Sequence, residues 1–339
     1  MQTLNEIREQ PIKHQILSEK YPDLIHELKS FIIDKKPEEI SFVGCGSSYY
    51  LAMGLSRQLK RFSRGKVASD YYSGSEVMFG MKRISSDSLL IGLSRSGESS
   101  ETVEALKKAK SNGIFTAAIT CEPESFLTRV ADVSSKLDFI NEKAIVMTKS
   151  FTSMAFLASA LARDLFSNET LLNYLKMIPE FSKKILTETE TLLDRLNFGS
   201  FNYFAFLGYE EYFATGMEGV IKATETSLSD VDCYQTLEYR HGPKSKVNEK
   251  SFITVIPNEK TLEEELKVMN EMRKLGGTVL AVYKEKIENF PTIVTDYKDD
   301  DFGDWFLRVI PLQMIGVKRA VERGLNPDQP TNLTKVVKF

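Results

Sequence analysis

Residues 40–48 read ISFVGCGSS, and residues 88–99 read SLLIGLSRSGES. In each stretch a short apolar run, typical of a buried strand, passes directly into glycines and serines. The residues that follow, about 48–62 and 99–112, have the pattern of a helix. Short apolar strands that alternate with helices predict βαβ units and a parallel sheet with helices on both faces.

The same pattern continues along the chain and then starts again. Further strands are predicted at 66–72, 114–121 and 133–139, followed by a helix at 150–166. After a long polar helical stretch at 169–196, strands are predicted at 203–208, 252–257, 278–283 and 292–295. Helices are predicted at 212–226, 262–275 and 304–323. We therefore predict an α/β protein built from two similar, doubly wound, flavodoxin-like domains.

The predicted boundaries follow from these elements. We expect an N-terminal helical segment at 1–39, a first domain at 40–167 and a helical linker at 168–200. A second domain at 201–323 and a C-terminal tail at 324–339 complete the chain. A length of 339 residues is comfortable for two domains of ordinary size.

Composition and charge exclude several classes of protein. The formal net charge of −3 argues against a nucleic-acid-binding protein, and no apolar run is long enough to span a membrane. The three cysteines, Cys45, Cys121 and Cys233, form no CxxC pair, and the three histidines are too few for a multi-histidine metal centre. The first residues lack the apolar core of a signal peptide. We expect a cytoplasmic protein with reduced thiols, no metal and no cofactor.

The two glycine- and serine-rich loops have the chemistry of an anion site. Glycine permits close approach of the backbone, serine supplies hydroxyl donors, and the helix that follows each loop directs its free amides toward an anion. The Walker and dinucleotide-binding patterns are absent, which disfavours a nucleotide. In the second half, the corresponding strand ends read GYEE (208–211) and PNE (257–259) and lack this density of glycine and serine. We therefore expect one anion site per chain, in the first half.

The motifs resemble those of a known family. Residues 44–48 and 94–99 are similar to the two loops of sugar isomerase (SIS) domains, and nearly the whole chain is similar to the isomerase half of glucosamine-6-phosphate synthase. The shared stretches, in order, also include TKSFT (148–152), KATETS (222–227), EYRHGP (238–243) and NLTK (332–335). The resemblance implies tandem SIS domains and a sugar-phosphate substrate.

Site residues follow from the same resemblance. The residues expected to bind the substrate and its phosphate are Gly46, Ser47, Ser48, Ser94, Arg95, Ser96, Ser99 and Thr148. The expected catalytic residues are Glu225, which moves a proton between sugar C1 and C2, Lys222 beside it, His241 as the ring-opening group, and Lys335 at the open-chain carbonyl. In the family the histidine is donated across a dimer interface, so a homodimer is expected. Recognition would thus come from one half of the chain and chemistry from the other.

Local sequence supports some of these roles. Lys222 and Glu225 are three residues apart, so a helix places them on one face, where a partly desolvated carboxylate could act as a base. His241 lies in a polar RHGP turn, and an imidazole that titrates near neutrality can transfer protons to and from a sugar ring. Lys335 could polarise the substrate carbonyl or form an imine. We expect His14 and His26 to lie on helix surfaces.

Departures from the synthase pattern set the expected reaction. The sequence has no glutaminase domain, Arg95 replaces the usual glutamine, and Met147 replaces a serine near the sugar. We expect a glucosamine-6-phosphate deaminase, which forms fructose 6-phosphate and ammonia. The alternatives are a phosphosugar isomerase, a deglycase for fructosamine phosphates, and a non-catalytic phosphosugar sensor.

Overall fold

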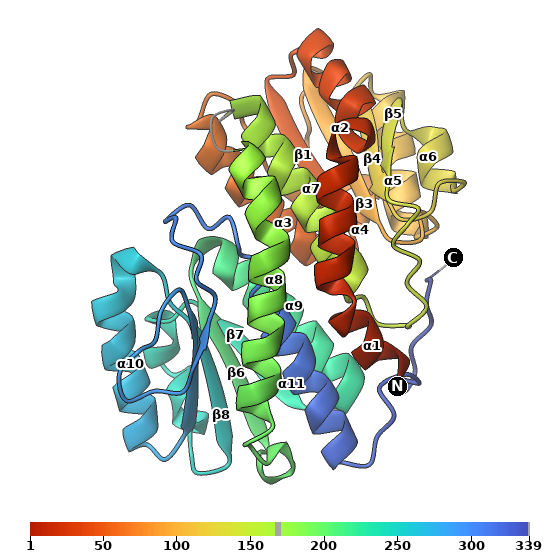
Figure 1. The fold of residues 1–339 in the computed structure, drawn as a ribbon. Coiled ribbons are helices and arrows are strands. Elements are labelled where there is room, and N and C mark those ends of the chain that lie inside the picture. Colours follow the sequence, from red (N-terminus) through yellow and green to blue (C-terminus); the bar gives the residue numbers. More distant parts are fainter. Residues whose placement is uncertain (167–170, 338–339) are drawn as a thin grey trace. The chain divides into compact units, whose positions relative to one another are not determined.

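The first half of the chain forms a parallel five-stranded sheet in the order β2-β1-β3-β4-β5. The computed structural model describes residues 1–166 and 171–337, and Figure 1 shows the path of the chain. The strands are β1 (Glu39–Gly44), β2 (Tyr71–Ser73), β3 (Ser88–Ser94), β4 (Phe115–Thr120) and β5 (Val133–Lys136). The first strand in the sequence, β1, therefore lies between β2 and β3.

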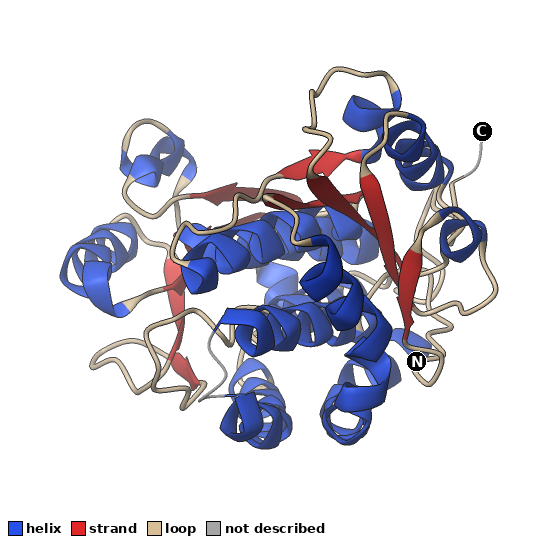
Figure 2. Ribbon diagram, turned by 90° about the horizontal axis from the view of Figure 1, so that it is seen from above, coloured by secondary structure: helices blue, strands red, loops and turns tan. Residues whose placement is uncertain are grey.

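Helices cover both faces of this sheet because successive strand residues point to opposite sides. One face packs against α4 (Gly74–Met78), α5 (Ser100–Ser111) and α6 (Phe126–Val130) in a core that includes Val43 and Leu90. The neighbouring residues Phe42 and Ile91 face α2 (Gln10–Lys35), α3 (Ser47–Ser63) and α7 (Lys149–Phe166). Figure 2 shows the helices of the chain in blue and its strands in red.

The second half repeats the topology. Its parallel sheet has the order β7-β6-β8-β9-β10, so each strand takes the place of the strand five numbers before it in the first sheet. The strands are β6 (Tyr203–Gly208), β7 (Asp230–Tyr234), β8 (Ser251–Ile256), β9 (Thr278–Tyr283) and β10 (Thr292–Val294). The helix α10 (Leu262–Lys274) packs on one face through Val268, Met269 and Met272. The paired helices α9 (Glu210–Ser227) and α11 (Val309–Glu322) pack together, and α9 contacts β6 and β7.

Six further helices belong to the described residues. They are α1 (Gln2–Arg8), α8 (Leu171–Leu193), η2 (Phe198–Ser200), η3 (Glu238–Arg240), η4 (Pro243–Lys246) and η5 (Glu259–Thr261). The chain separates into two compact units. The first-sheet unit comprises residues 9–143, 147–179 and 334–339, and the second-sheet unit comprises residues 1–8, 144–146 and 180–333.

The predicted fold class, two parallel sheets flanked by helices, is confirmed. The strands predicted at 203–208 and 278–283 have the observed bounds, whereas β7 was not predicted because its sequence, DVDCY, is polar and only partly buried. The first two residues of the helix predicted at 169–196 lie outside the described residues, and α8 covers 171–193 of it. The surface position expected for His14 is wrong: its side chain is fully buried, while His26 is exposed. None of the helices in the described ranges is long and apolar enough to cross a membrane.

Candidate functional site

The loop after β1 brings the backbone sharply into helix α3. Gly46 has a φ of +57°, a conformation that glycine adopts at little cost, and it is the N-cap residue of the helix. Ser47 and Ser48 form the first turn and are buried, at 6% and 4% exposure. The predicted binding residues of this loop therefore lie at the start of a long helix, at the carboxyl edge of the sheet.

The loop after β3 is organised by its own serines. The amide of Gly97 donates to Oγ of Ser94 at 3.0 Å, and the Oγ atoms of Ser94 and Ser99 lie 3.4 Å apart. The amide of Glu98 donates to Oγ of Ser96 at 3.2 Å. Gly97 has a φ of +63°, and a Cβ there would lie 2.1 Å from Oγ of Ser125. The loop thus requires glycine at position 97 and brings the hydroxyls of Ser94 and Ser99 together.

These two loops are adjacent because β1 and β3 are paired parallel strands. Their carboxyl ends therefore meet at one edge, which is where open α/β sheets bind ligands. A contact of 3.5 Å between Sγ of Cys45 and Oγ1 of Thr102 joins the first loop to helix α5. The arrangement predicted from the two sequence stretches is present.

Helix capping differs between the predicted binding loops and two serines outside them. Ser73 and Ser125 each form a capping box at the starts of α4 and α6, where the hydroxyl accepts from a backbone amide. Ser99 and Gly46, at the starts of α5 and α3, make no side-chain cap. The first-turn amides of these two longer helices are therefore not satisfied by their N-cap side chains, and such amides attract anions.

The guanidinium of Arg95, which follows β3, is almost fully buried and forms an ion pair with Glu142. The distance from Nη1 of Arg95 to Oε2 of Glu142 is 3.0 Å, and the side-chain exposures are 8% and 0%. Nη2 of Arg95 donates to the carbonyl oxygen of Lys335 at 3.2 Å. The guanidinium of Arg95 thus contacts the carboxylate of Glu142 and the backbone of Lys335. The predicted role of Arg95 as a phosphate ligand stays a prediction.

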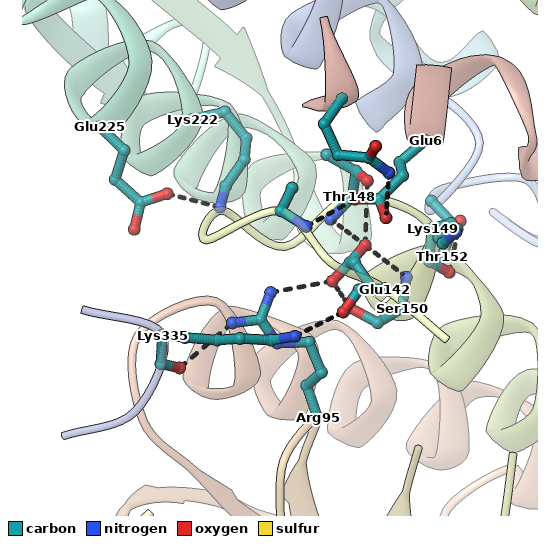
Figure 3. Close-up of polar contacts among 12 residues, drawn as sticks. Glu6, Arg95, Glu142, Thr148, Lys149, Ser150, Thr152, Lys222, Glu225 and Lys335 are labelled. Atoms are coloured by element: carbon teal, nitrogen blue, oxygen red, sulfur yellow. Dashed lines mark hydrogen bonds and ion pairs between the residues drawn. The ribbon is translucent and has the colours of Figure 1, made fainter. Parts of the chain in front are cut away.

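Glu142 is a site residue that the sequence did not reveal. Its carboxylate accepts from the amide and Oγ1 of Thr148 at 2.8 and 2.9 Å, and from the amide and hydroxyl of Ser150. Burial alone would raise the pKa of Glu142, but Arg95 and the donors from Ser150 and Thr148 outweigh it and hold the pKa below its usual value. Thr148, a predicted binding residue, is thus fixed by Glu142 (Figure 3).

Lys335 is the only residue of the tail with a predicted catalytic role. Its Nζ donates to the carbonyl oxygen of Glu142 at 2.6 Å. Lys335 therefore contacts the Arg95–Glu142 pair through both its side chain and its backbone. Figure 3 shows these contacts together with those of Glu142.

The predicted proton-transfer pair lies on α9 in the second-sheet unit. Nζ of Lys222 is 2.6 Å from Oε2 of Glu225 and 3.5 Å from Oε1 of Glu218. The side chains of Lys222 and Glu218 are buried, whereas Glu225 keeps 26% of its side chain exposed. The expected contact between Lys222 and Glu225 is present, and the most accessible member of the group is the carboxylate predicted to act as the base.

His241 lies just after η3, and its imidazole is exposed on this chain. The predicted residues are thus divided between the units, with Lys222, Glu225 and His241 in the second-sheet unit and the others in the first-sheet unit. Across the described parts of the chain, no three His, Cys, Asp or Glu side chains are grouped so as to hold a metal ion.

The sheet topology defines an α/β protein with two serine-containing loops at the carboxyl edge of its first sheet. The family model for the SIS domain matches residues 32–163. The crystal structure of glucosamine-6-phosphate deaminase from Thermotoga maritima is 30% identical, covers 99% of each chain and has a TM-score of 0.83. This chain therefore belongs to the SIS domain family.

Two further comparisons show the breadth of the family. Glutamine–fructose-6-phosphate aminotransferase from Francisella tularensis is 27% identical over 98% of this chain, which spans 58% of that relative. The chain thus covers a little over half the length of that curated relative. Tagatose-6-phosphate ketose/aldose isomerase from Escherichia coli, at 20% identity, has the same fold, with a TM-score of 0.82 and coverage of 98% and 97% of the two chains.

Proposed function

We propose that this chain is a glucosamine-6-phosphate deaminase that forms fructose 6-phosphate and ammonia. The observation that carries the proposal is the end-to-end similarity to the deaminase from Thermotoga maritima, at 30% identity over 99% of both chains. The proposed binding partners of the protein are a sugar phosphate and a second copy of the chain.

Recognition is proposed to begin with the phosphate. Gly46, Ser47 and Ser48 from one loop, and Ser94, Ser96 and Ser99 from the other, supply amides, hydroxyls and two helix N-termini. A doubly charged phosphate gains charge-assisted hydrogen bonds from such donors, which are stronger than those between neutral groups.

The chemistry proposed for Glu225 is a proton transfer between adjacent carbons. In the open-chain aldehyde, the carboxylate removes the proton from C2 while the carbonyl oxygen takes up a proton from water, which leaves an enolamine. Return of the proton to C1 gives an iminium ion at C2, which loses an N–H proton to water. The product is an imine at C2, which water hydrolyses to the ketone with release of ammonia. Lys222, held at 2.6 Å from Glu225, is proposed to orient the carboxylate.

Ring opening and closure are proposed for His241, and Lys335 is proposed to polarise the open-chain carbonyl. A histidine that is exposed on one chain is available to a second copy, and we propose a homodimer in which His241 is donated across the interface. Replacing His241 with Asn should then slow turnover from the ring form of the substrate.

The test is a product assay with purified protein. Glucosamine 6-phosphate should yield ammonia and fructose 6-phosphate in equal amounts, with no effect of EDTA. Parallel reactions with hexose phosphates and fructosamine phosphates distinguish an isomerase or a deglycase. Tight binding of a sugar phosphate without turnover of any of them would instead indicate a sensor and would contradict the proposal.

A further inference from the structure

The buried ion pair of Arg95 and Glu142 joins parts of the chain that are distant in sequence. Arg95 follows β3, and Glu142 lies 47 residues later, between β5 and α7. The two charges are almost completely removed from water, so each needs full hydrogen bonding to be tolerated. Glu142 obtains it from Thr148, Ser150 and Arg95, which fixes the carboxylate in one position.

The same pair holds the end of the chain. Lys335, 240 residues after Arg95, receives a hydrogen bond from Nη2 of Arg95 on its carbonyl oxygen. Its own Nζ donates to the carbonyl oxygen of Glu142. Residues 331–334 of the tail are exposed, so they bury little surface that could hold it. Position 335 is therefore anchored by two polar contacts, one to the guanidinium of Arg95 and one to the backbone carbonyl oxygen of Glu142.

A planar guanidinium suits this task. One edge of Arg95 can bind a carboxylate while another nitrogen binds a backbone carbonyl, whereas a neutral side chain cannot pair with a buried carboxylate in this way. Removing Arg95 would leave Glu142 buried without its cation and would free the carbonyl of Lys335.

We propose that Arg95 and Glu142 form a clamp for the C-terminal tail, and that Arg95 is a positioning residue for Lys335 rather than a ligand of the substrate phosphate. The consequence for turnover rests on the function proposed above, in which Lys335 acts on the open-chain carbonyl. The clamp itself does not depend on that function. Phosphate recognition then belongs to the serine loops.

Two measurements that need no turnover test the clamp. Trypsin cleavage after Lys335, followed by mass spectrometry, should be at least about tenfold faster in Arg95→Gln than in the wild type, because the scissile carbonyl loses its donor. The dissociation constant of inorganic phosphate, measured by calorimetry, should change less than about threefold. Arg83→Gln, an exposed arginine of the same unit, is the matched control and should change neither.

The kinetic signature separates positioning from simple loss of structure. Arg95→Gln should lower kcat for ammonia release at least about tenfold with little change in KM, and Arg95→Lys, which keeps the charge, should recover part of kcat. Glu142→Gln should reproduce the faster tail cleavage, and the double variant should be no worse than the worse single one. Thermal unfolding of each variant verifies that it is folded. If Glu142→Gln does not fold, the comparison of Arg95→Gln with Arg95→Lys tests the clamp in its place.

The opposite pattern overturns the proposal. If Arg95→Gln leaves tail cleavage unchanged and weakens the binding of inorganic phosphate tenfold or more, Arg95 is a phosphate ligand. If the wild type releases no ammonia but Arg95→Gln still frees the tail, the deaminase function fails and the clamp stands.

Discussion

The carboxyl edges of the two sheets are built on one topology but contain opposite chemistry. At the first edge, the hydroxyls of Ser94 and Ser99 lie 3.4 Å apart, and Ser99, the N-cap residue of α5, makes no side-chain hydrogen bond to the first-turn amides. At the second edge, the equivalent loop after β8 is bound by a carboxylate of the protein itself. Oε2 of Glu265 accepts from the amide of Asn258 at 3.1 Å and from Oγ1 of Thr261 at 2.8 Å.

Glu265 lies at the start of the helix that follows β8, beside the loop whose donors it accepts from. It sits in the first turn of α10, which follows β8 as α5 follows β3, and its Oε1 accepts from Oγ1 of Thr236 at 2.6 Å. Its side chain is fully buried, and burial raises its pKa although these donors oppose the shift. A carboxylate of the protein thus satisfies these donors at the second edge.

A second cluster fills the rest of that edge. Nη1 of Arg308 donates to the carbonyl oxygens of Pro257 and Val282, at the ends of β8 and β9, at 3.2 and 3.1 Å. Nε of Arg308 donates to Asp304, which also accepts from the hydroxyl of Tyr212 in the first turn of α9. The comparison teaches that one sheet topology can present serine hydroxyls at its carboxyl edge or fill that edge with charged side chains of its own.

The largest expected effect comes from Glu225, the proposed base. Glu225→Gln keeps the size and removes the carboxylate, so kcat should fall by about 10³-fold, since general base catalysis typically contributes 10²–10⁴-fold. Binding of inorganic phosphate should stay within about threefold of the wild type, because the second-sheet unit would supply chemistry and not phosphate recognition. Steady-state kinetics and calorimetry measure the two effects.

The matched control is Glu264→Gln. Glu264 also pairs with a lysine three residues away at 2.6 Å, but on an exposed helix face. It should leave both quantities unchanged. Equal losses in the two variants, or full turnover by Glu225→Gln, would contradict the assignment of the base.

Removing the internal carboxylate tests the comparison from the other side. Glu265→Ala leaves a buried amide and two hydroxyls without their acceptor, so the free energy of unfolding should fall by about 3 kcal/mol. Added formate, which can take the place of the carboxylate, should raise the melting temperature of this variant more than that of the wild type.

Glu263→Ala, two residues earlier in the same turn and 87% exposed, should cost less than about 0.5 kcal/mol. If Glu265→Ala is as stable as the wild type, Glu265 does not serve as the internal anion of the second sheet.

Acid should destabilise the first-sheet unit through His14. Burial lowers the pKa of His14 from 6.5 to about 3, so the folded state keeps the ring neutral while the unfolded state takes up a proton below pH 6.5. The stabilisation is complete above pH 6.5 and is lost as the pH falls from 6.5 toward 3, by about 2 kcal/mol at pH 5.

Urea unfolding at pH 7.5 and pH 5.0 should show a smaller loss of stability in His14→Gln than in the wild type. His26→Gln, which changes an exposed residue of the same helix, should behave as the wild type does. Identical pH dependence in all three proteins would show that His14 is protonated in the folded state.

The smallest expected effect separates binding serines from capping serines. Ser99→Ala should raise KM and weaken phosphate binding about tenfold, as expected for one hydrogen bond to a charged group, with little change in stability because Ser99 makes no side-chain cap. Ser73→Ala should do the reverse, since it breaks a capping box worth about 1 kcal/mol. Thermal unfolding and steady-state kinetics measure both effects. Equal changes of stability and KM in the two variants would contradict the distinction between the two serines.

Local pattern was sufficient for most of the fold and for part of the candidate site. Continuous apolar runs such as 203–208 predict buried parallel strands because both faces of the sheet are covered. Strand β7 was not predicted because it is a polar strand at the edge of its sheet. The contact of Lys222 with Glu225 followed from helical spacing alone. Glu142 belongs to no local pattern, and only its burial among donors marks it.

By itself the sequence determined the alternation of strands and helices, the serine loops and the inequality of the two halves, because these are properties of short segments. Tertiary structure alone decided which distant groups meet, as when Arg95 finds Glu142 and Lys335. The run of three glutamates at 263–265 makes the point: Glu263 is exposed while Glu265 is fully buried. The residue type is the same at both positions. They differ only because the helix directs one side chain toward water and the other toward the end of the sheet.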